Sequence, residues 1–139
     1  DGKSHGTSAA MEFAIKHLDV KHIIVFGHSQ CGGIKSLMEG DHLDHEYGFI
    51  DPWMKIAKSA REAVVNGYAD EDFDAQCIRC EKASIQMSLN NLKTFPWIKE
   101  RYDAGKLFIH GWYFDIESGS LFGNQGDQFV PVKDLVFVS

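Results

Sequence analysis

Cysteine is scarce in this sequence, and its scarcity excludes one large class of small protein. The 139 residues contain three cysteines, Cys31, Cys77 and Cys80. An odd number at this low density is not the pattern of a secreted domain held together by disulfide bonds. A reducing compartment fits better, so a cytoplasmic location is predicted. Any targeting segment upstream of Asp1 would lie outside this sequence.

Basic charge and long apolar runs are also lacking. Lys and Arg number 14 against 20 Asp and Glu, which gives a formal net charge of -6. Nucleic acids and anionic membranes bind to positively charged surfaces, so neither is expected as a partner. No stretch approaches the roughly 18 consecutive apolar residues of a membrane span, and the first residues are unlike a signal peptide. Small molecules and other protein subunits remain as the expected partners.

The chain does contain enough apolar material for one core. Hydrophobic residues make up 44% of the 139 residues, which suits a single domain over residues 1–139 and is too little for two. Residues 7–18 repeat apolar side chains at helical spacing, with Ser4 before them as a candidate N-cap. Residues 23–26, with the sequence IIVF, form a short unbroken apolar run that is typical of a strand buried on both faces.

The remaining pattern alternates helices with strands and predicts an α/β fold. After the loop at residues 28–33 we expect helices at 34–38, 53–65, 72–92 and 96–102, strands at 107–116 and 121–122, and an edge strand at 136–138. Such an order implies a mostly parallel central sheet flanked by helices. Sheets of this kind place functional loops at the carboxyl ends of their strands, where residues 28–33 are expected.

The loop at residues 28–33 carries two candidate metal ligands. His28 and Cys31 offer an imidazole nitrogen and a thiolate, a mixed donor set that Zn²⁺ accepts readily. A catalytic zinc normally has three protein ligands and one open position, so at least one ligand must come from elsewhere. Gly32 and Gly33 then begin a helix, where free backbone N–H groups favour an anion, and both are expected to contact substrate. Taken alone, the His-x-x-Cys pair fits a polar turn with a buried thiol equally well.

Longer motifs carry a resemblance to a known family. They are EFA at residues 12–14, VKHIIVFGHSQCGGI at 20–34, the stretch from Glu81 to LKTFP at 92–96, and GKL at 105–107 with HGWYFDI at 110–116. Their types and order resemble the β-class carbonic anhydrases over about residues 6–121. The resemblance implies zinc ligation by His28 and Cys31, bicarbonate held at the backbone of Gly32, and reversible hydration of carbon dioxide to bicarbonate. It also implies that Phe13, often Tyr in the family, lines the pocket of a neighbouring subunit in a homodimer or higher oligomer.

One family motif has no match. The first zinc ligand of the family is a Cys in Cys-x-Asp-x-Arg, whose Asp and Arg control access to the metal, and residues 1–28 contain nothing like it. We therefore expect that the chain is the C-terminal part of such an enzyme, that no catalytic residue lies within it, and that the activity of this part alone is impaired.

Three other readings of the residues stay open at this point. Cys77 and Cys80 could join His28 and Cys31 in a structural Cys₃His zinc module, although both cysteines extend the apolar side of an expected helix. The sequence GHSQC at residues 27–31 nearly matches the Gly-x-Ser-x-Gly nucleophile elbow of the α/β hydrolases, but its last position is Cys. The same scaffold could also serve assembly without catalysis.

Overall fold

A computed structural model describes residues 6–40, 53–126 and 128–135, and it contains a four-stranded sheet in the order β1-β2-β3-β4. Strand β1 (His22–His28) pairs in parallel with β2 (Phe108–Asp115). Strands β3 (Ser120–Gln125) and β4 (Gln128–Pro131) follow as antiparallel neighbours. The α/β prediction is confirmed. Because one of these three described pairings is parallel, the sheet is mixed rather than mostly parallel.

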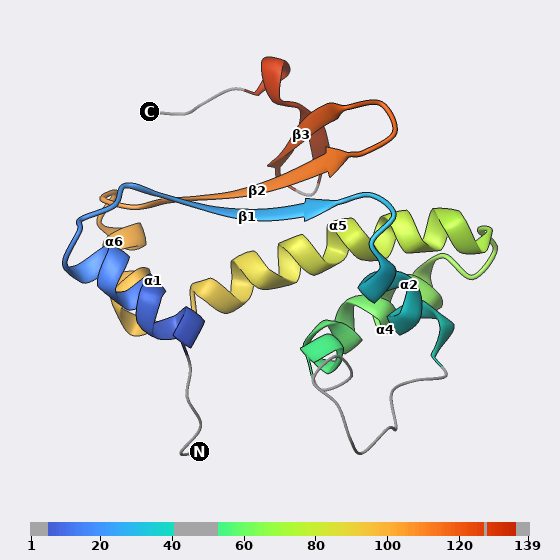
Figure 1. Cartoon of the computed structure of the whole chain (residues 1–139), viewed down its shortest axis with the longest axis horizontal. Coiled ribbons are helices and arrows are strands. Elements are labelled where there is room, and N and C mark those ends of the chain that lie inside the picture. The colour runs from blue at the N-terminus through green and yellow to red at the C-terminus, as the bar shows by residue number, and fades with distance from the viewer. Residues whose placement is uncertain (1–5, 41–52, 127, 136–139) are drawn as a thin grey trace.

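The helices gather at the two ends of the sheet and along one of its faces (Figure 1). Helices α1 (Gly6–Lys16) and α6 (Pro96–Asp103) pack together at one end, and α2 (Gly32–Glu39) and α4 (Lys58–Gly67) at the other. Helix α5 (Phe73–Leu92) joins the two ends. Two short 3-10 turns complete the order, Lys55–Ala57 before α4 and Val132–Asp134 after β4. The helices and the first three strands agree with the sequence prediction to within a few residues.

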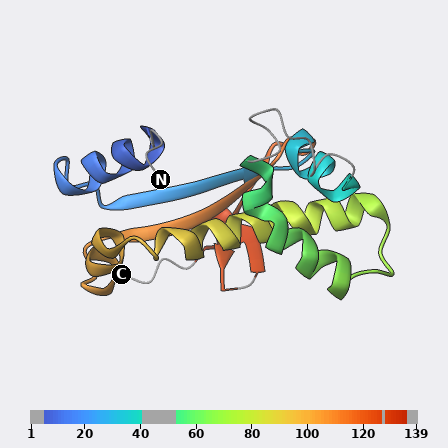
Figure 2. The same ribbon diagram turned by 90° about the horizontal axis from the view of Figure 1, so that it is seen from below.

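Helix α5 lies directly on β1 and β2, as both views show (Figures 1 and 2). Two glycines permit this approach. A Cβ added at Gly27 would stand 2.6 Å from Cδ1 of Ile85, and one at Gly111 would stand 2.9 Å from side-chain atoms of both Ile85 and Leu89. Ile85 and Leu89 are buried, one helical turn apart, so they form the stripe of α5 that faces the sheet.

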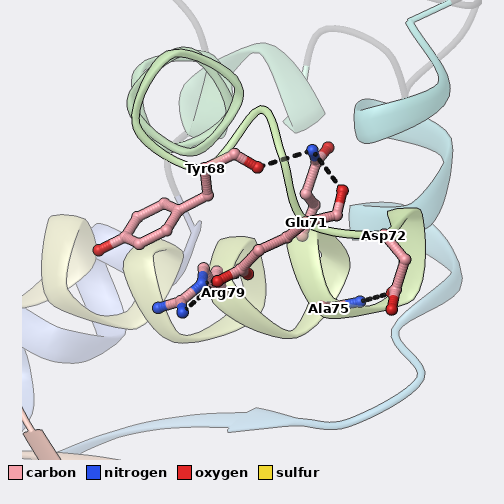
Figure 3. Close-up of polar contacts among 6 residues, drawn as sticks. Tyr68, Glu71, Asp72, Ala75 and Arg79 are labelled. Atoms are coloured by element: carbon pink, nitrogen blue, oxygen red, sulfur yellow. Dashed lines mark hydrogen bonds and ion pairs between the residues drawn. The ribbon is translucent and has the colours of Figure 1, made fainter.

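Polar contacts fix the point where α5 begins (Figure 3). Asp72 is its N-cap, and the carboxylate accepts a hydrogen bond of 2.8 Å from the Ala75 N–H. Arg79, two turns into the helix, binds both carboxylate oxygens of Glu71 and lies with its guanidinium carbon 3.8 Å from the centre of the Tyr68 ring. These contacts tie the connection between α4 and α5 to the helix, and thereby set which residues of α5 face the sheet.

The prediction that β1 is buried on both faces is wrong for the described residues. Its side chains alternate, and Ile24 and Phe26 are 44% and 58% exposed on the face opposite α5. An apolar run shows that a strand can be buried, but it does not supply the element that covers it.

Further differences concern the edges of the molecule. Strand β4 was not predicted, because four residues that end in proline give a weak pattern at a sheet edge. The predicted strand at 136–138 and the Ser4 N-cap lie outside the described residues. Among the described helices, none combines the length and the hydropathy that a membrane span requires.

Candidate functional site

The two predicted metal ligands lie on the wall of one cavity. His28 is the last residue of β1 and Cys31 is the N-cap of α2, so three peptide bonds connect a strand end to a helix start. The cavity has a volume of about 270 Å³. Its other walls are largely apolar, and include Phe26, Ile34, Trp53, Met54, Ile56 and Ala57. The fold thus brings an imidazole and a thiol to a small, mainly apolar space.

The imidazole of His28 is oriented by its own loop. Its Nδ1 lies 2.8 Å from the carbonyl oxygen of Ser29. Because a carbonyl oxygen only accepts, Nδ1 must carry the hydrogen, so in the neutral ring the free lone pair is on Nε2. Metal-bound histidines commonly show this pattern, in which the second ring nitrogen donates to a carbonyl or a carboxylate. The neutral tautomer that a metal requires is therefore the one that this hydrogen bond selects.

Ser29, the next residue, fastens the loop to the end of β2. Its N–H donates to the Phe114 carbonyl at 2.9 Å, its hydroxyl donates to Asp115 at 3.0 Å, and the same hydroxyl accepts from the Ile116 N–H at 2.8 Å. Hydrogen bonds from Ser118 and then from Ser29 hold the pKa of the Asp115 carboxyl below its usual value. Ser29 is buried, and each of its polar groups has a hydrogen-bond partner within the protein, as burial requires.

Gln30 turns the chain between the two candidate ligands. Its φ of 56° lies in the left-handed region, which few residues other than glycine adopt. A non-glycine residue in this region costs about 1–3 kcal/mol, and the conformation persists only where its surroundings enforce it. The bonds of Ser29 on one side and of Cys31 on the other provide that enforcement.

Cys31 is held by a carboxylate from α5. Its N–H donates to Oε1 of Glu81 at 2.9 Å, and the hydroxyl of Tyr113, on β2, donates to Oε2 of the same carboxylate at 2.7 Å. Glu81 and Tyr113 are each 4% exposed. Burial, and then the hydrogen bond to Glu81, raise the pKa of Tyr113, so its hydroxyl remains a donor throughout the neutral range.

Sequence reasoning missed this carboxylate, although a signal was present. Glu81 stands four residues before Ile85 and eight before Leu89, on the stripe of α5 that faces the sheet. A carboxylate on an apolar stripe indicates a buried polar contact. Tyr113 had no comparable signal, because an aromatic residue at a buried strand position is ordinary.

The three predicted substrate contacts lie in different parts of the structure. Gly32 is the first residue of α2, with open space where a Cβ would be, while Gly33 packs against Met54, whose sulfur would be 3.0 Å from an added Cβ. Phe13 lies on α1, at the other end of the sheet from α2, and is 54% exposed beside the ring of His17 (Figure 1). Phe13 therefore does not line this cavity of its own chain.

The Cys₃His module is not formed. Within residues 6–40, 53–126 and 128–135, no group of three or more His, Cys, Asp or Glu side chains is arranged to hold a metal ion. Cys80 is fully buried in an apolar cluster with Cys77 and Cys31 at its border, and burial raises the pKa of the Cys80 thiol to about 11. That thiol packs as a small apolar side chain and does not favour the thiolate form that a metal needs.

Known proteins resemble the chain in sequence. A family model described as carbonic anhydrase matches residues 2–121. Beta carbonic anhydrase 5, chloroplastic, of Arabidopsis thaliana is 42% identical over 109 residues, which are 78% of this chain and 36% of that protein. Beta carbonic anhydrase 6, mitochondrial, of the same plant is 40% identical over 116 residues, 83% of this chain and 40% of that protein. The chain thus spans about two fifths or less of the length of these relatives.

Solved structures agree with the fold. The β-carbonic anhydrase CcaA superposes with a TM-score of 0.86 at 32% identity, over 94% of this chain and 59% of that one. One of two β-carbonic anhydrases described as tetrameric, from the filamentous ascomycete Sordaria macrospora, gives a TM-score of 0.75 at 29% identity, over 88% of this chain and 61% of that one. Since the family model covers most of its length and its fold agrees with these structures, the chain belongs to the β-carbonic anhydrase family.

Proposed function

We propose that the protein catalyses the reversible hydration of carbon dioxide to bicarbonate and a proton, with a Zn²⁺ ion held in part by His28 and Cys31. The observation that carries this proposal is that both side chains line one cavity, with Nε2 of His28 left free by the bond from Nδ1 to Ser29. The donor set fits zinc, which accepts imidazole nitrogen and thiolate sulfur together. When bound, zinc supplies the positive charge that makes water a nucleophile near neutral pH.

The residues around the two ligands suit a small apolar substrate and an anionic product. Phe26, Trp53 and Ile56 contribute apolar surface to the cavity, which matches carbon dioxide. The first turn of α2 has backbone N–H groups without helical partners, beginning at Gly32, and these can donate to bicarbonate. Carbon dioxide would then contact the apolar wall of the cavity, and bicarbonate would bind at the start of α2.

A third protein ligand is required, and we propose that it comes from residues outside the described part of the chain. The family pattern supplies a Cys with an Asp–Arg pair in a motif absent from these 139 residues, and the relatives are more than twice as long as the stretch they share with this chain. With two ligands alone, the chain should hold zinc poorly and hydrate carbon dioxide no faster than buffer.

We also propose that the protein works as a homodimer or larger homo-oligomer. Phe13 is exposed on α1, away from the cavity of its own chain, as expected if it meets a neighbouring subunit. The Sordaria enzymes are described as tetrameric. Light scattering after size exclusion gives the oligomeric state directly. The compartment stays a prediction, since the two plant relatives are named as chloroplastic and mitochondrial.

Metal content tests the proposal and separates it from a second candidate, an inactive domain that serves assembly. That candidate is favoured by the lack of a three-donor group among the described residues. Elemental analysis of the complete protein should give about one zinc per chain, and His28→Ala or Cys31→Ala should remove it. His17→Ala is the matched control, because His17 lies on α1 beside Phe13 and should retain zinc. A complete protein without zinc, or with zinc that survives both ligand substitutions, would refute the proposal.

A further inference from the structure

Glu81 is the least expected buried group in the structure. The residue is 4% exposed, and no Lys, Arg or His nitrogen of the described residues forms an ion pair with its carboxylate. Removing a carboxylate from water costs several kcal/mol unless hydrogen bonds or a cation compensate. An apolar residue at this position of α5 would pack against the sheet at a lower cost in free energy. A group kept at such a position calls for a role that packing does not explain.

The contacts of Glu81 indicate what that role is. Its two oxygens are each occupied by a donor, the Cys31 N–H at 2.9 Å and the Tyr113 hydroxyl at 2.7 Å. A carboxylate offers acceptors at both oxygens and no donor of its own, so it satisfies two donors at once. Tyr113 fixes the carboxylate from β2, and the carboxylate fixes Cys31.

Apart from its packing at the border of the apolar cluster around Cys80, Cys31 has few other restraints on its position. It is the N-cap of α2 but makes no side-chain capping bond, and its carbonyl accepts from Lys35 as an ordinary first turn requires. The preceding residue, Gln30, is in the left-handed conformation. Without the bond to Glu81, the backbone between Ser29 and α2 could relax out of this strained conformation, and the Cys31 side chain would leave the cavity wall.

We propose that Glu81 is a positioning residue for Cys31, and that through one hydrogen bond from α5 it keeps the thiol on the cavity wall that His28 shares. The inference rests on the proposed function, because it takes Cys31 as a metal ligand. It adds a third chain segment to the two-residue motif, so the site depends on how α5 packs on β1 and β2 as well as on the loop.

The first test measures the restraint itself, without metal. Hydrogen exchange at the Cys31 amide is followed by NMR in the unsubstituted chain, in Glu81→Ala and in Glu81→Gln. Loss of the acceptor should speed exchange about tenfold or more in Glu81→Ala, and less in Glu81→Gln, whose amide oxygen can still accept. Ile98→Val is the control for general destabilisation, because Ile98 is buried on α6 at the other end of the sheet.

The second test measures the metal. Cobalt(II) is titrated into the complete protein carrying the same substitutions, and the part of the thiolate-to-cobalt charge-transfer band that Cys31→Ser removes reports ligation by Cys31. Substitutions next to metal ligands typically weaken affinity about 10–100-fold, so Glu81→Ala should fall in this range while Ile98→Val stays at the unsubstituted value. A change confined to the folding equilibrium would not alter the band at saturating cobalt, whereas a displaced thiolate would weaken it. If Glu81→Ala does not fold, Glu81→Gln carries both tests.

The outcomes separate this inference from the proposed function. A weaker band in Cys31→Ser, together with unchanged exchange and cobalt affinity in the Glu81 variants, overturns the positioning role and leaves the metal assignment intact. A band of unchanged intensity in Cys31→Ser, or no band in the unsubstituted complete protein, removes Cys31 as a ligand and overturns both.

Discussion

Replacing Gly27 with Ala should destabilise the protein through the contact between α5 and the sheet. The new methyl group would stand 2.6 Å from Cδ1 and 2.8 Å from Cγ1 of Ile85. Carbon atoms that are not bonded prefer separations of about 3.5–4.0 Å, so the helix or the side chain must move by about 1 Å. Ile85 is 2% exposed and belongs to a buried cluster with Leu89 and Tyr113, so it can give way only toward the cavity that it lines.

The expected cost follows from core overpacking, which typically destabilises by about 1–3 kcal/mol. Urea unfolding monitored by circular dichroism should show a lower midpoint with an unchanged slope. In a thermal melt, each kcal/mol should lower the midpoint by about 3–5 °C for a chain of this size. Gly67→Ala is the control, because nothing lies within 4 Å of an added Cβ at that position, and its effect should stay within about 0.5 kcal/mol.

A double substitution tests the cause. Ile85→Val removes the nearest atom, Cδ1, and should by itself cost about 0.5–1.5 kcal/mol. If the clash is the source of the effect, the free energy lost by Gly27→Ala with Ile85→Val should be smaller than the sum of the two by at least about 0.5 kcal/mol. Strict additivity, or a Gly27→Ala variant as stable as the unsubstituted protein, would refute the account of how α5 sits on β1.

Three further predictions concern other parts of the molecule. Asp72→Ala removes the N-cap of α5 and should cost about 1 kcal/mol in urea unfolding, while Asp72→Asn should cost less because its side-chain oxygen can still accept from Ala75. Hydrogen bonds from Lys21 and then Arg101 lower the pKa of Asp19 to about 2 from 3.8, so the unfolded chain binds more protons than the folded one between about pH 4 and pH 2. Stability should therefore fall as the pH drops through this window, and Asp19→Asn should make the acid limb shallower; an identical limb would contradict this. Burial raises the pKa of Cys80 to about 11, so peptide mapping after treatment with iodoacetamide at pH 8 should find Cys80 unmodified in the folded protein and modified in urea.

Much of the fold was predictable because its signals are local. The helical spacing at residues 72–92 and the proline at the start of residues 96–102 gave α5 and α6 to within a residue. Burial was harder to predict, since it depends on what lies across from a strand. The run at residues 23–26 is equally apolar along its length, yet Ile24 and Phe26 are exposed on the face that α5 leaves uncovered.

The candidate site likewise has a part that could be predicted from local sequence and a part that could not. His28 and Cys31 are three residues apart and could be paired from sequence because the strand end and the helix start position both. Glu81 is 50 residues from Cys31 and Tyr113 is a further 32, so their meeting depends on α5 crossing the parallel strands in one register. No short motif encodes that register; it arises from the packing of Ile85 and Leu89 over Gly27 and Gly111.

The two residues between His28 and Cys31 meet different structural requirements, which a library randomised at both positions would reveal. Position 29 must fill a buried space while it donates to Asp115 and accepts from the Ile116 N–H, which threonine and alanine do less well than serine. Position 30 must adopt a positive φ, so glycine, asparagine and aspartate should be enriched there and valine and isoleucine depleted. A selection for folded protein alone, in the absence of any metal, should show the same preference. The reason is that the turn between His28 and Cys31 restricts these two positions whether or not a metal is bound.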